Sequence, residues 1–251
     1  MNTLFDAHIH FNLSKDSPAS DLLQQLKDNE VGGCNLILNT PQEKEYFFKH
    51  WTEFEKSDIN FIYSLTFDPD SFSFMRKHGL RFWMKIHPRI ENISSKQVND
   101  ISKIISDEKP CGVVVDCWPD DLSPENDCGA RIGAALAEKF PYLNIVLAHS
   151  GGIFMRETMF LTRKLNNIFY DTALTANYFF ESAMQQDFSY ALRFFGNRMM
   201  FGSDYPDFTV KAAIQRMKQI VDFASGNDDL YHRYSSINAQ KVFCQEKEGA
   251  I

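Results

Sequence analysis

The sequence lacks the features that mark several large classes of protein. No stretch approaches the roughly 20 consecutive apolar residues that span a bilayer, and residues 1–10 have neither the basic start nor the apolar run of a secretory leader. Basic residues are not in excess, since 26 Lys and Arg stand against 33 Asp and Glu, a formal net charge of −7. We therefore expect no membrane or nucleic-acid partner, because both need clustered cations.

Cysteine is present in an odd number, and no two cysteines form a Cys-x-x-Cys pair. The five residues are Cys34, Cys111, Cys117, Cys128 and Cys244. A chain of 251 residues that is 44% hydrophobic can bury a core without disulfide bonds. We expect reduced thiols and a cytoplasmic protein.

Short β-type runs alternate with amphipathic segments along the sequence. The candidate strands are 4–10, 34–39, 60–67, 81–87, 112–118, 144–149, 167–172 and 199–204. Several of them are almost continuously apolar, which is typical of parallel strands buried on both faces. The segments between them carry apolar residues at helical spacing, such as Ile101 and Ile105 after the fourth run.

A closed barrel and an open doubly wound sheet both have this order of elements. Eight strand-and-helix units in 251 residues match the usual size of a (β/α)₈ TIM barrel. No Gly-x-Gly-x-x-Gly turn follows the first run, as it would in a dinucleotide-binding open sheet. No linker, repeat or low-complexity segment divides the chain. We predict one α/β domain, a (β/α)₈ barrel over residues 1–251.

The clearest functional signal is the pair His8 and His10 at the end of the first predicted strand. Side chains two residues apart on a strand share a face, and the C-terminal ends of barrel strands carry the active site. The last predicted strand ends at Asp204, and barrel closure makes the first and last strands neighbours. Two imidazoles and a carboxylate there predict a site for one divalent ion, with Zn²⁺ expected. The alternatives are hydrogen-bonded core histidines and an Asp204 that caps the next helix.

His149 ends the sixth run at the same mouth and is followed by two glycines, Gly151 and Gly152. We predict that His149 acts as a base, an acid or a ligand, and that the glycines let backbone amides approach a bound anion. The alternative is a histidine that supports the site through a hydrogen bond without touching substrate.

Three further residues at the end of the fourth run are predicted to contact substrate. Lys85 and His87 share one face of that strand, and Arg89 follows it as a possible receptor for a carboxylate or phosphate. The alternatives are a Lys85 that pairs with a buried carboxylate, a His87 that packs below Pro88, and a solvated Arg89.

Several short motifs stand at the ends of these predicted strands. They are Asp-Ala-His-Ile-His at 6–10, Met-Lys-Ile-His-Pro at 84–88, Leu-Ala-His-Ser-Gly-Gly at 147–152, Phe-Gly-Ser-Asp-Tyr-Pro at 201–206 and Asn-Ala at 238–239. In this order they resemble the amidohydrolase superfamily, in particular its amidohydrolase-2 branch. The resemblance implies a TIM-barrel enzyme in which His8, His10 and Asp204 bind metal and His149 is catalytic.

The branch normally has a metal-binding histidine at the end of its fifth strand, where this sequence has Asp116. Three interpretations stay open. Asp116 could be an oxygen ligand that makes the site more tolerant of ions such as Mn²⁺. It could instead orient another ligand and leave a weaker site. Or the protein could work without metal, as some lactonases of the branch do.

Residues and resemblance together favour metal-dependent hydrolysis of a C–O or C–N bond in a small, carboxylated molecule, with the proton moved by Asp204 or His149. The first alternative is non-oxidative decarboxylation of a small aromatic or unsaturated acid by the same site. The second is a barrel that works without metal or has no catalytic function. The loops after the strands are short, so the pocket is either open or completed by a neighbouring subunit of a homo-oligomer.

Overall fold

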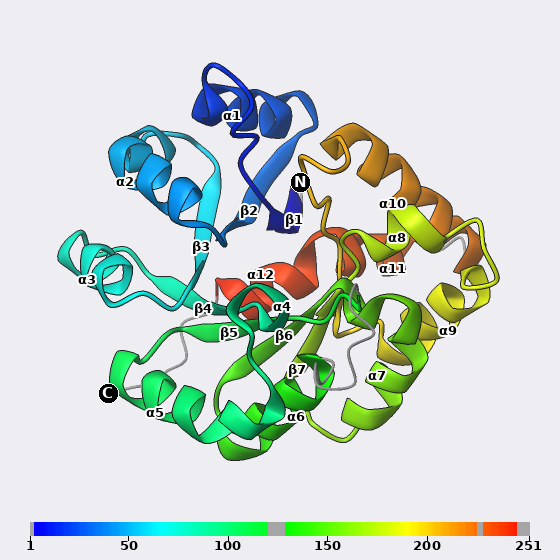
Figure 1. The fold of residues 1–251 in the computed structure, drawn as a ribbon. Helices are drawn as coiled ribbons and strands as arrows, with labels where there is room; N and C mark the ends of the chain where they lie inside the picture. The colour runs from blue at the N-terminus through cyan, green and yellow to red at the C-terminus, as the bar shows by residue number, and fades with distance from the viewer. Residues whose placement is uncertain (1–2, 120–128, 225–227, 245–251) are drawn as a thin grey trace.

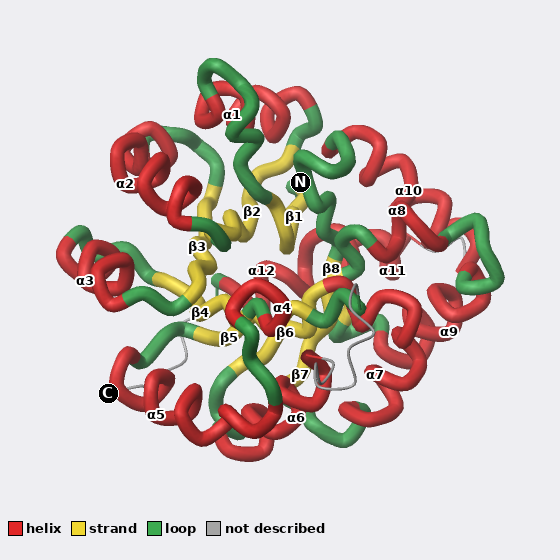
Figure 2. The backbone as a smooth tube through the Cα atoms, viewed as in Figure 1, coloured by secondary structure: helices red, strands yellow, loops and turns green. Residues whose placement is uncertain are grey.

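The eight predicted runs form eight parallel strands that pair in chain order, from β1 beside β2 to β7 beside β8. The structure is a computed structural model and describes residues 3–119, 129–224 and 228–244. The strands are β1 (Leu4–Ile9), β2 (Val31–Leu38), β3 (Asn60–Thr66), β4 (Phe82–Ile86), β5 (Gly112–Asp116), β6 (Asn144–Ala148), β7 (Ile168–Asp171) and β8 (Met199–Met200). In Figures 1 and 2 they lie at the centre, with helices around them.

Helices follow the strands; most of them cover the outside of the sheet, and the last one lies across the floor of the barrel. They are α1 (Pro18–Asp28), α2 (Pro41–Glu55), α3 (Pro69–Lys77), α4 (Pro88–Glu91), α5 (Val98–Glu108), α6 (Gly129–Lys139), α7 (Met155–Thr162), α8 (Thr175–Phe179), α9 (Gln185–Phe195), α10 (Val210–Ala224), α11 (Asp228–His232) and α12 (Asn238–Phe243). Shorter turns occur at Ser95–Gln97, His149–Phe154 and Arg233–Ile237. No helix among the described residues has the length and apolar character needed to cross a membrane.

The residues after β8 close the barrel against β1. The Ala7 N–H donates to the Phe201 carbonyl at 2.8 Å, the Asp204 N–H donates to the His8 carbonyl at 2.9 Å, and the His10 N–H donates to the Tyr205 carbonyl at 2.8 Å. Regular strand geometry was predicted through residue 204 but ends at Met200, and in the closing segment Asp204 takes a left-handed backbone with φ of 58°. The predicted single-domain (β/α)₈ barrel is confirmed.

A bulge interrupts β1 between Asp6 and Ile9, and it contains His8, the first of the two histidines. Asp6 pairs with Cys34 and Ile9 with Leu36, so three steps along β1 stand opposite two along β2. The Asp6 carboxylate Oδ1 accepts the His8 N–H at 3.1 Å and the Ser203 N–H at 2.9 Å. Asp6 therefore binds the backbone of the bulge to the closing segment, and bulges of this kind commonly re-aim side chains next to active sites.

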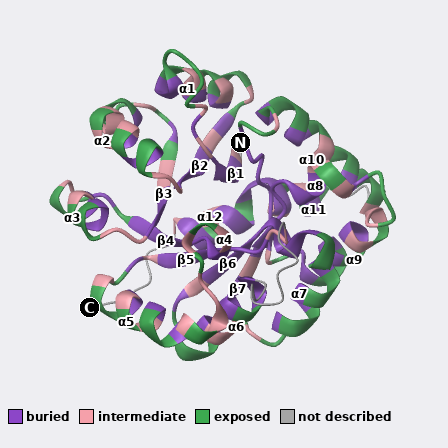
Figure 3. Cartoon of the chain, in the orientation of Figure 1, coloured by how far each residue is buried: buried purple, intermediate pink, exposed green. Residues whose placement is uncertain are grey.

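The buried apolar residues form two clusters, one between strands and helices and one inside the barrel. Strand residues of the larger cluster pack with helix residues such as Leu22 and Ile101. The smaller cluster is Phe5, Ala7, Trp83, Val114, Val146, Ala148, Met200, Ala239, Val242 and Phe243. Figure 3 shows buried residues on the strands and exposed residues on the outer helix surfaces.

The cysteines have no disulfide partners in the part of the chain that the structure describes. Cys34, Cys111, Cys117 and Cys244 are free thiols, and Cys128 lies outside the described residues. All four are buried or partly buried. In this part of the chain, packing rather than disulfide bonds stabilises the fold.

The floor of the barrel generates the first prediction. Phe243 of α12 is 1% exposed and packs against Phe5 and Trp83, with ring centroids 5.8 and 4.5 Å away. We expect Phe243→Ala to lower the free energy of unfolding by about 3–5 kcal/mol, because it leaves a cavity among rigid aromatic neighbours. Phe194 of α9 is 69% exposed and is the matched control, with an expected change within about 0.5 kcal/mol. If chemical denaturation shows the same loss of stability for alanine at Phe243 and at Phe194, Phe243 is not packed in the floor of the barrel.

Candidate active site

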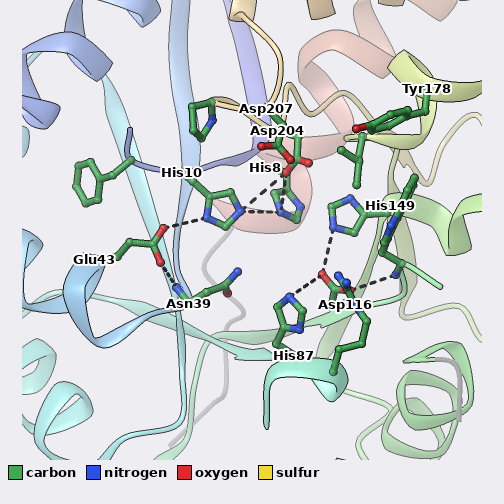
Figure 4. A pocket seen from close by; sticks show the side chains of 15 residues that line it. His8, His10, Asn39, Glu43, His87, Asp116, His149, Tyr178, Asp204 and Asp207 are labelled. Atoms are coloured by element: carbon green, nitrogen blue, oxygen red, sulfur yellow. Dashed lines mark hydrogen bonds and ion pairs between the residues drawn. The ribbon is translucent and has the colours of Figure 1, made fainter. Parts of the chain in front are cut away.

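Three possible metal-binding atoms converge where β1 meets the segment after β8. His10 Nε2 lies 3.3 Å from His8 Nε2, and Asp204 Oδ1 lies 3.4 Å from His8 Nε2 and 3.9 Å from His10 Nε2. Ligand atoms held at about 2.0–2.1 Å around a tetrahedral Zn²⁺ are about 3.4 Å from one another. These atoms therefore have nearly the spacing that a tetrahedral ion needs, and the three residues form a group that could hold a metal (Figure 4).

A carboxylate lies behind each histidine of this group. His8 Nδ1 is 3.1 Å from Asp171 Oδ2, and His10 Nδ1 is 3.3 Å from Glu43 Oε1. A carboxylate accepts the Nδ1 proton, so the Nε2 lone pair is left for a cation, as in many metal sites. Burial, and next the charge of Lys85, hold the pKa of His8 well below its usual range, so this imidazole is neutral. A neutral imidazole is the form that binds metal.

The sequence predictions did not include Asp171 or Glu43. Asp171 ends β7 at the barrel mouth, and strand ends at this mouth often carry catalytic residues, so its position was a usable signal. Glu43 belongs to a Thr-x-x-Glu pattern that marks the start of a helix. Its contact with His10 depends on how α2 begins in three dimensions, and the sequence pattern does not contain that information.

Asp204 does not cap the helix that follows it. The Ala212 N–H at the start of α10 is accepted by Thr209 Oγ1 at 3.2 Å. The Asp204 carboxylate instead faces the two histidines of β1, as Figure 4 shows.

Asp116 lies outside this group, at the centre of a set of cationic and hydrogen-bonding groups. Its Oδ2 is 3.1 Å from His149 Nε2 and 3.5 Å from both Lys85 Nζ and His87 Nε2, and its Oδ1 is 3.3 Å from Arg89. Burial alone would raise the pKa of Asp116. The Lys85 charge, followed by that of His149, outweighs burial and holds this pKa well below its usual value. Asp116 is therefore a carboxylate whose two oxygens are both engaged by side chains.

His149 is held between two oxygen acceptors. Its Nε2 is 3.1 Å from Asp116 Oδ2, and its Nδ1 is 3.0 Å from the Ala173 carbonyl oxygen. Both ring nitrogens can donate only if both carry a proton, so this environment favours the imidazolium cation. Burial lowers the pKa of His149, but the Asp116 carboxylate outweighs that effect and raises it to about 9. His149 is suited to carry a proton at neutral pH.

A cavity of about 550 Å³ opens at this end of the barrel, within the usual size of a small-molecule site. His8, His10, Asp116, His149 and Asp204 line it. Its apolar walls are formed by Phe11, Trp118, Leu174, Tyr178 and Pro206, none of which was predicted as a site residue.

The three predicted substrate-contacting residues lie at different depths. His87 and Arg89 line the cavity, and the Arg89 side chain is 25% exposed. Lys85 is fully buried, is not among the described lining residues, and pairs with Asp116. The His87 imidazole also accepts the Ile90 N–H at 3.4 Å and so caps α4. Burial lowers the pKa of His87 to about 4, so this ring is neutral.

Strained backbone is concentrated at the mouth. His149 has φ of 59° and Asp204 has φ of 58°, a region that non-glycine residues seldom occupy. Such conformations cost about 1–3 kcal/mol each and persist where surrounding contacts hold them. In this site the backbone bonds to β1 hold Asp204, and Asp171 Oδ1 accepts the His149 N–H at 2.9 Å.

The glycines after His149 serve packing rather than the predicted ligand contact. Gly151 and Gly152 do not appear among the described lining residues of the cavity. A Cβ on Gly151 would lie 2.2 Å from Thr158 Oγ1, and one on Gly152 would lie 2.6 Å from Pro119 Cδ. Both also have positive φ, so a tight turn packed on its neighbours accounts for the two glycines.

The fold and these side chains define a TIM barrel with a possible His, His, Asp metal-binding group at its mouth. The family model described as amidohydrolase matches residues 130–244, which include His149 and Asp204. The predicted resemblance to the amidohydrolase superfamily is confirmed over this part of the chain. A search of curated proteins found no match to this chain.

Solved structures of low sequence identity share the fold. An uncharacterised TIM-barrel protein from Bordetella bronchiseptica is 14% identical with a TM-score of 0.67, covering 89% of this chain and 81% of its own. A 5-methylcytosine deaminase from Klebsiella pneumoniae is 13% identical with a TM-score of 0.66, covering 96% and 75%. A 5-carboxyvanillate decarboxylase from Sphingomonas paucimobilis is 12% identical with a TM-score of 0.50, covering 98% and 100%. The neighbours thus include different reaction types on one fold.

The ion pair beneath the cavity generates a prediction about stability. Asp116→Ala leaves the Lys85 ammonium, which is fully buried, without its carboxylate. We expect the free energy of unfolding to fall by about 3–5 kcal/mol, the usual cost of stranding one member of a buried pair. Adding Lys85→Met should recover much of this loss, because it removes the stranded charge. Equal denaturation midpoints for the single and double variants would contradict the prediction.

A second prediction concerns Gly202, where the closing segment passes behind His8. A Cβ at this position would lie 2.9 Å from both the His8 and the Ala173 Cβ atoms. We expect Gly202→Ala to destabilise the fold by about 1–3 kcal/mol through overpacking. A crystal structure of the variant should show the His8 backbone displaced from its position against the closing segment. An unmoved His8 and unchanged stability would disprove the close contact.

Proposed function

We propose that the protein is a divalent-metal-dependent hydrolase that cleaves a C–O or C–N bond in a small, carboxylated molecule. The observation that carries this proposal is the near-tetrahedral spacing of His8 Nε2, His10 Nε2 and Asp204 Oδ1. The carboxylates behind the two imidazoles support it, because they keep both Nε2 lone pairs directed at the same point.

His8, His10 and Asp204 would hold the ion, and Zn²⁺ suits two nitrogens and one oxygen. When bound, a divalent ion supplies acidification of a water molecule and polarisation of a substrate carbonyl. The apolar walls formed by Trp118 and Leu174 limit bulk water around the reacting bond.

Two residues are proposed to move protons. Asp204 is the base, because its carboxylate lies at the mouth beside both imidazoles and lines the cavity. His149 is the acid, since its two nitrogens face oxygen acceptors and it lines the same cavity. In this arrangement Asp204 takes a proton from water, and His149 gives one to the leaving oxygen or nitrogen.

The opposite side of the cavity supports a carboxylated substrate. Arg89 lines this side, its side chain is partly exposed, and its Nη2 lies 3.3 Å from Asp116 Oδ1. A guanidinium presents several N–H donors in a plane, which suits a second carboxylate. The neutral His87 lines the same cavity. We propose that Arg89 receives the substrate carboxylate while Asp116 keeps both Arg89 and His149 in place.

The proposal is tested by metal content and by product analysis. We expect close to one divalent ion per chain after mild purification, and acid release from members of a panel of carboxylated lactones, esters and amides. Chelation should abolish turnover, and added Zn²⁺ should restore it. Release of CO₂ from aromatic acids in place of hydrolysis would favour the decarboxylase alternative. A metal-free protein whose activity ignores chelators would disprove metal-dependent hydrolysis.

Substitutions at His10 and Asp116 test which residues bind the metal directly. His10→Ala should abolish metal binding while far-UV circular dichroism stays unchanged, since the apolar core lies below the site. Asp116→Ala should weaken metal affinity by at most about 10- to 100-fold, as expected of a residue that does not bind the ion directly. If Asp116→Ala weakens affinity as much as His10→Ala, and Asp116→His restores it, Asp116 is itself a ligand.

A further inference from the structure

Glu43 occupies the first turn of α2 and has two sets of contacts. Through Oε2 it accepts the Asn39 N–H at 3.0 Å, the Thr40 N–H at 2.8 Å and the Thr40 hydroxyl at 2.9 Å. Thr40 Oγ1 in turn accepts the Glu43 N–H at 3.2 Å, which completes a capping box. The other oxygen, Oε1, lies 3.3 Å from His10 Nδ1. Figure 4 shows Glu43 between Asn39 and His10.

These contacts assign a different task to each carboxylate oxygen. Oε2 satisfies two backbone N–H groups at the helix start, which would otherwise lack partners within the helix. Oε1 faces His10, and an ionised carboxylate can only accept a hydrogen bond. Because Oε2 already accepts three hydrogen bonds, the carboxylate has no proton to donate through Oε1, so the contact needs a proton on His10 Nδ1.

The turn that carries Glu43 is fixed by more than the capping box. The adjacent Lys44 is 7% exposed, and its Nζ lies 3.3 Å from Thr66 Oγ1 and 3.5 Å from Asp68 Oδ2. Thr66 Oγ1 also donates to the Asn39 carbonyl at 3.0 Å. The start of α2 is thus bonded to the end of β3, and a group held on such an anchored element keeps a neighbouring imidazole in one orientation.

We propose that Glu43 is the positioning residue of His10, with the capping box of α2 setting the tautomer that directs the His10 Nε2 lone pair at His8 and Asp204. This inference rests on the proposed function for the purpose of that lone pair. It assigns a role to a residue of the second strand-and-helix unit, whereas the metal-binding atoms come from the first and the last. A helix cap and a metal-binding histidine share one carboxylate.

Two variants separate positioning from capping. In Glu43→Gln the amide oxygen can still accept from Asn39 and Thr40, but the amide nitrogen then faces His10 and donates, so the proton of His10 moves to Nε2. Glu43→Ala removes both contacts. The chain offers a matched control in Gln97, whose Oε1 accepts the Ser94 N–H at 2.7 Å in a second capping box. Gln97→Ala removes a cap and leaves the metal-binding group untouched.

Zn²⁺ affinity and the melting temperature of the metal-free protein give distinct expected patterns. Glu43→Gln should keep the melting temperature and lose at least about 10-fold in Zn²⁺ affinity. Glu43→Ala should lower both the melting temperature and the Zn²⁺ affinity, whereas Gln97→Ala should lower only the melting temperature. Asp207→Asn, which neutralises an exposed carboxylate of the same cavity, controls for charge and should change affinity by less than about 3-fold. Affinity within about 3-fold of the parent in both Glu43 variants would overturn the proposal.

The tautomer itself is measured by ¹⁵N NMR of the histidine rings, at a pH where the imidazoles are neutral. We expect His10 to carry its proton on Nδ1 in the parent protein and on Nε2 in Glu43→Gln. An unchanged tautomer in Glu43→Gln would overturn the inference even if Zn²⁺ affinity falls. If the parent protein binds no Zn²⁺, the proposed function fails, while the NMR result still decides whether Glu43 sets the His10 tautomer.

Discussion

Barrel closure between β1 and the segment after β8 is the contact on which the site depends. The Asp204 N–H donates to the His8 carbonyl, so the backbones of two metal-binding candidates are joined directly. Residues separated by almost the whole chain are thereby brought to one point. The same contact holds Asp204 in its left-handed conformation and requires the absence of a side chain at Gly202. Strain at the mouth is therefore sustained by hydrogen bonds that also complete the fold.

Charge is divided across the cavity. On the side of β1, carboxylates prevail, with Asp204 in front of the imidazoles and Asp171 and Glu43 behind them. On the side of β4, Lys85 and Arg89 lie beside the carboxylate of Asp116. A cation is favoured on the first side and an anion on the second. This division of charge is the reason for proposing a substrate with a polar reacting bond at one end and a carboxylate at the other.

The barrel could be predicted from the sequence because the spacing of apolar residues indicates strands and helices, and their regular alternation indicates a parallel sheet. All eight strands were located, and the largest error, at the eighth, arose from the irregular closing segment. His8, His10 and Asp204 were predicted to lie together because strand ends in a barrel share one mouth. Glu43 was missed because its pattern describes a helix start, and its link to His10 needs the position of α2. For Asp116, the sequence left three interpretations open, and only the neighbouring Lys85, Arg89 and His149 reveal a carboxylate enclosed by donors.

The extra residue in β1 divides this strand into two phases. Before the bulge, Phe5 and Ala7 pack in the barrel interior, and after it His8 and His10 face the cavity. In a strand of uniform alternation, residues 5 and 7 could not share a face with residues 8 and 10. The apolar residues of the barrel floor and the polar residues at its mouth therefore lie in two separate parts of this strand. Loss or gain of one residue between Asp6 and Ile9 would instead exchange imidazoles for aliphatic side chains at the rim. At this position the number of residues is therefore constrained as well as their identity.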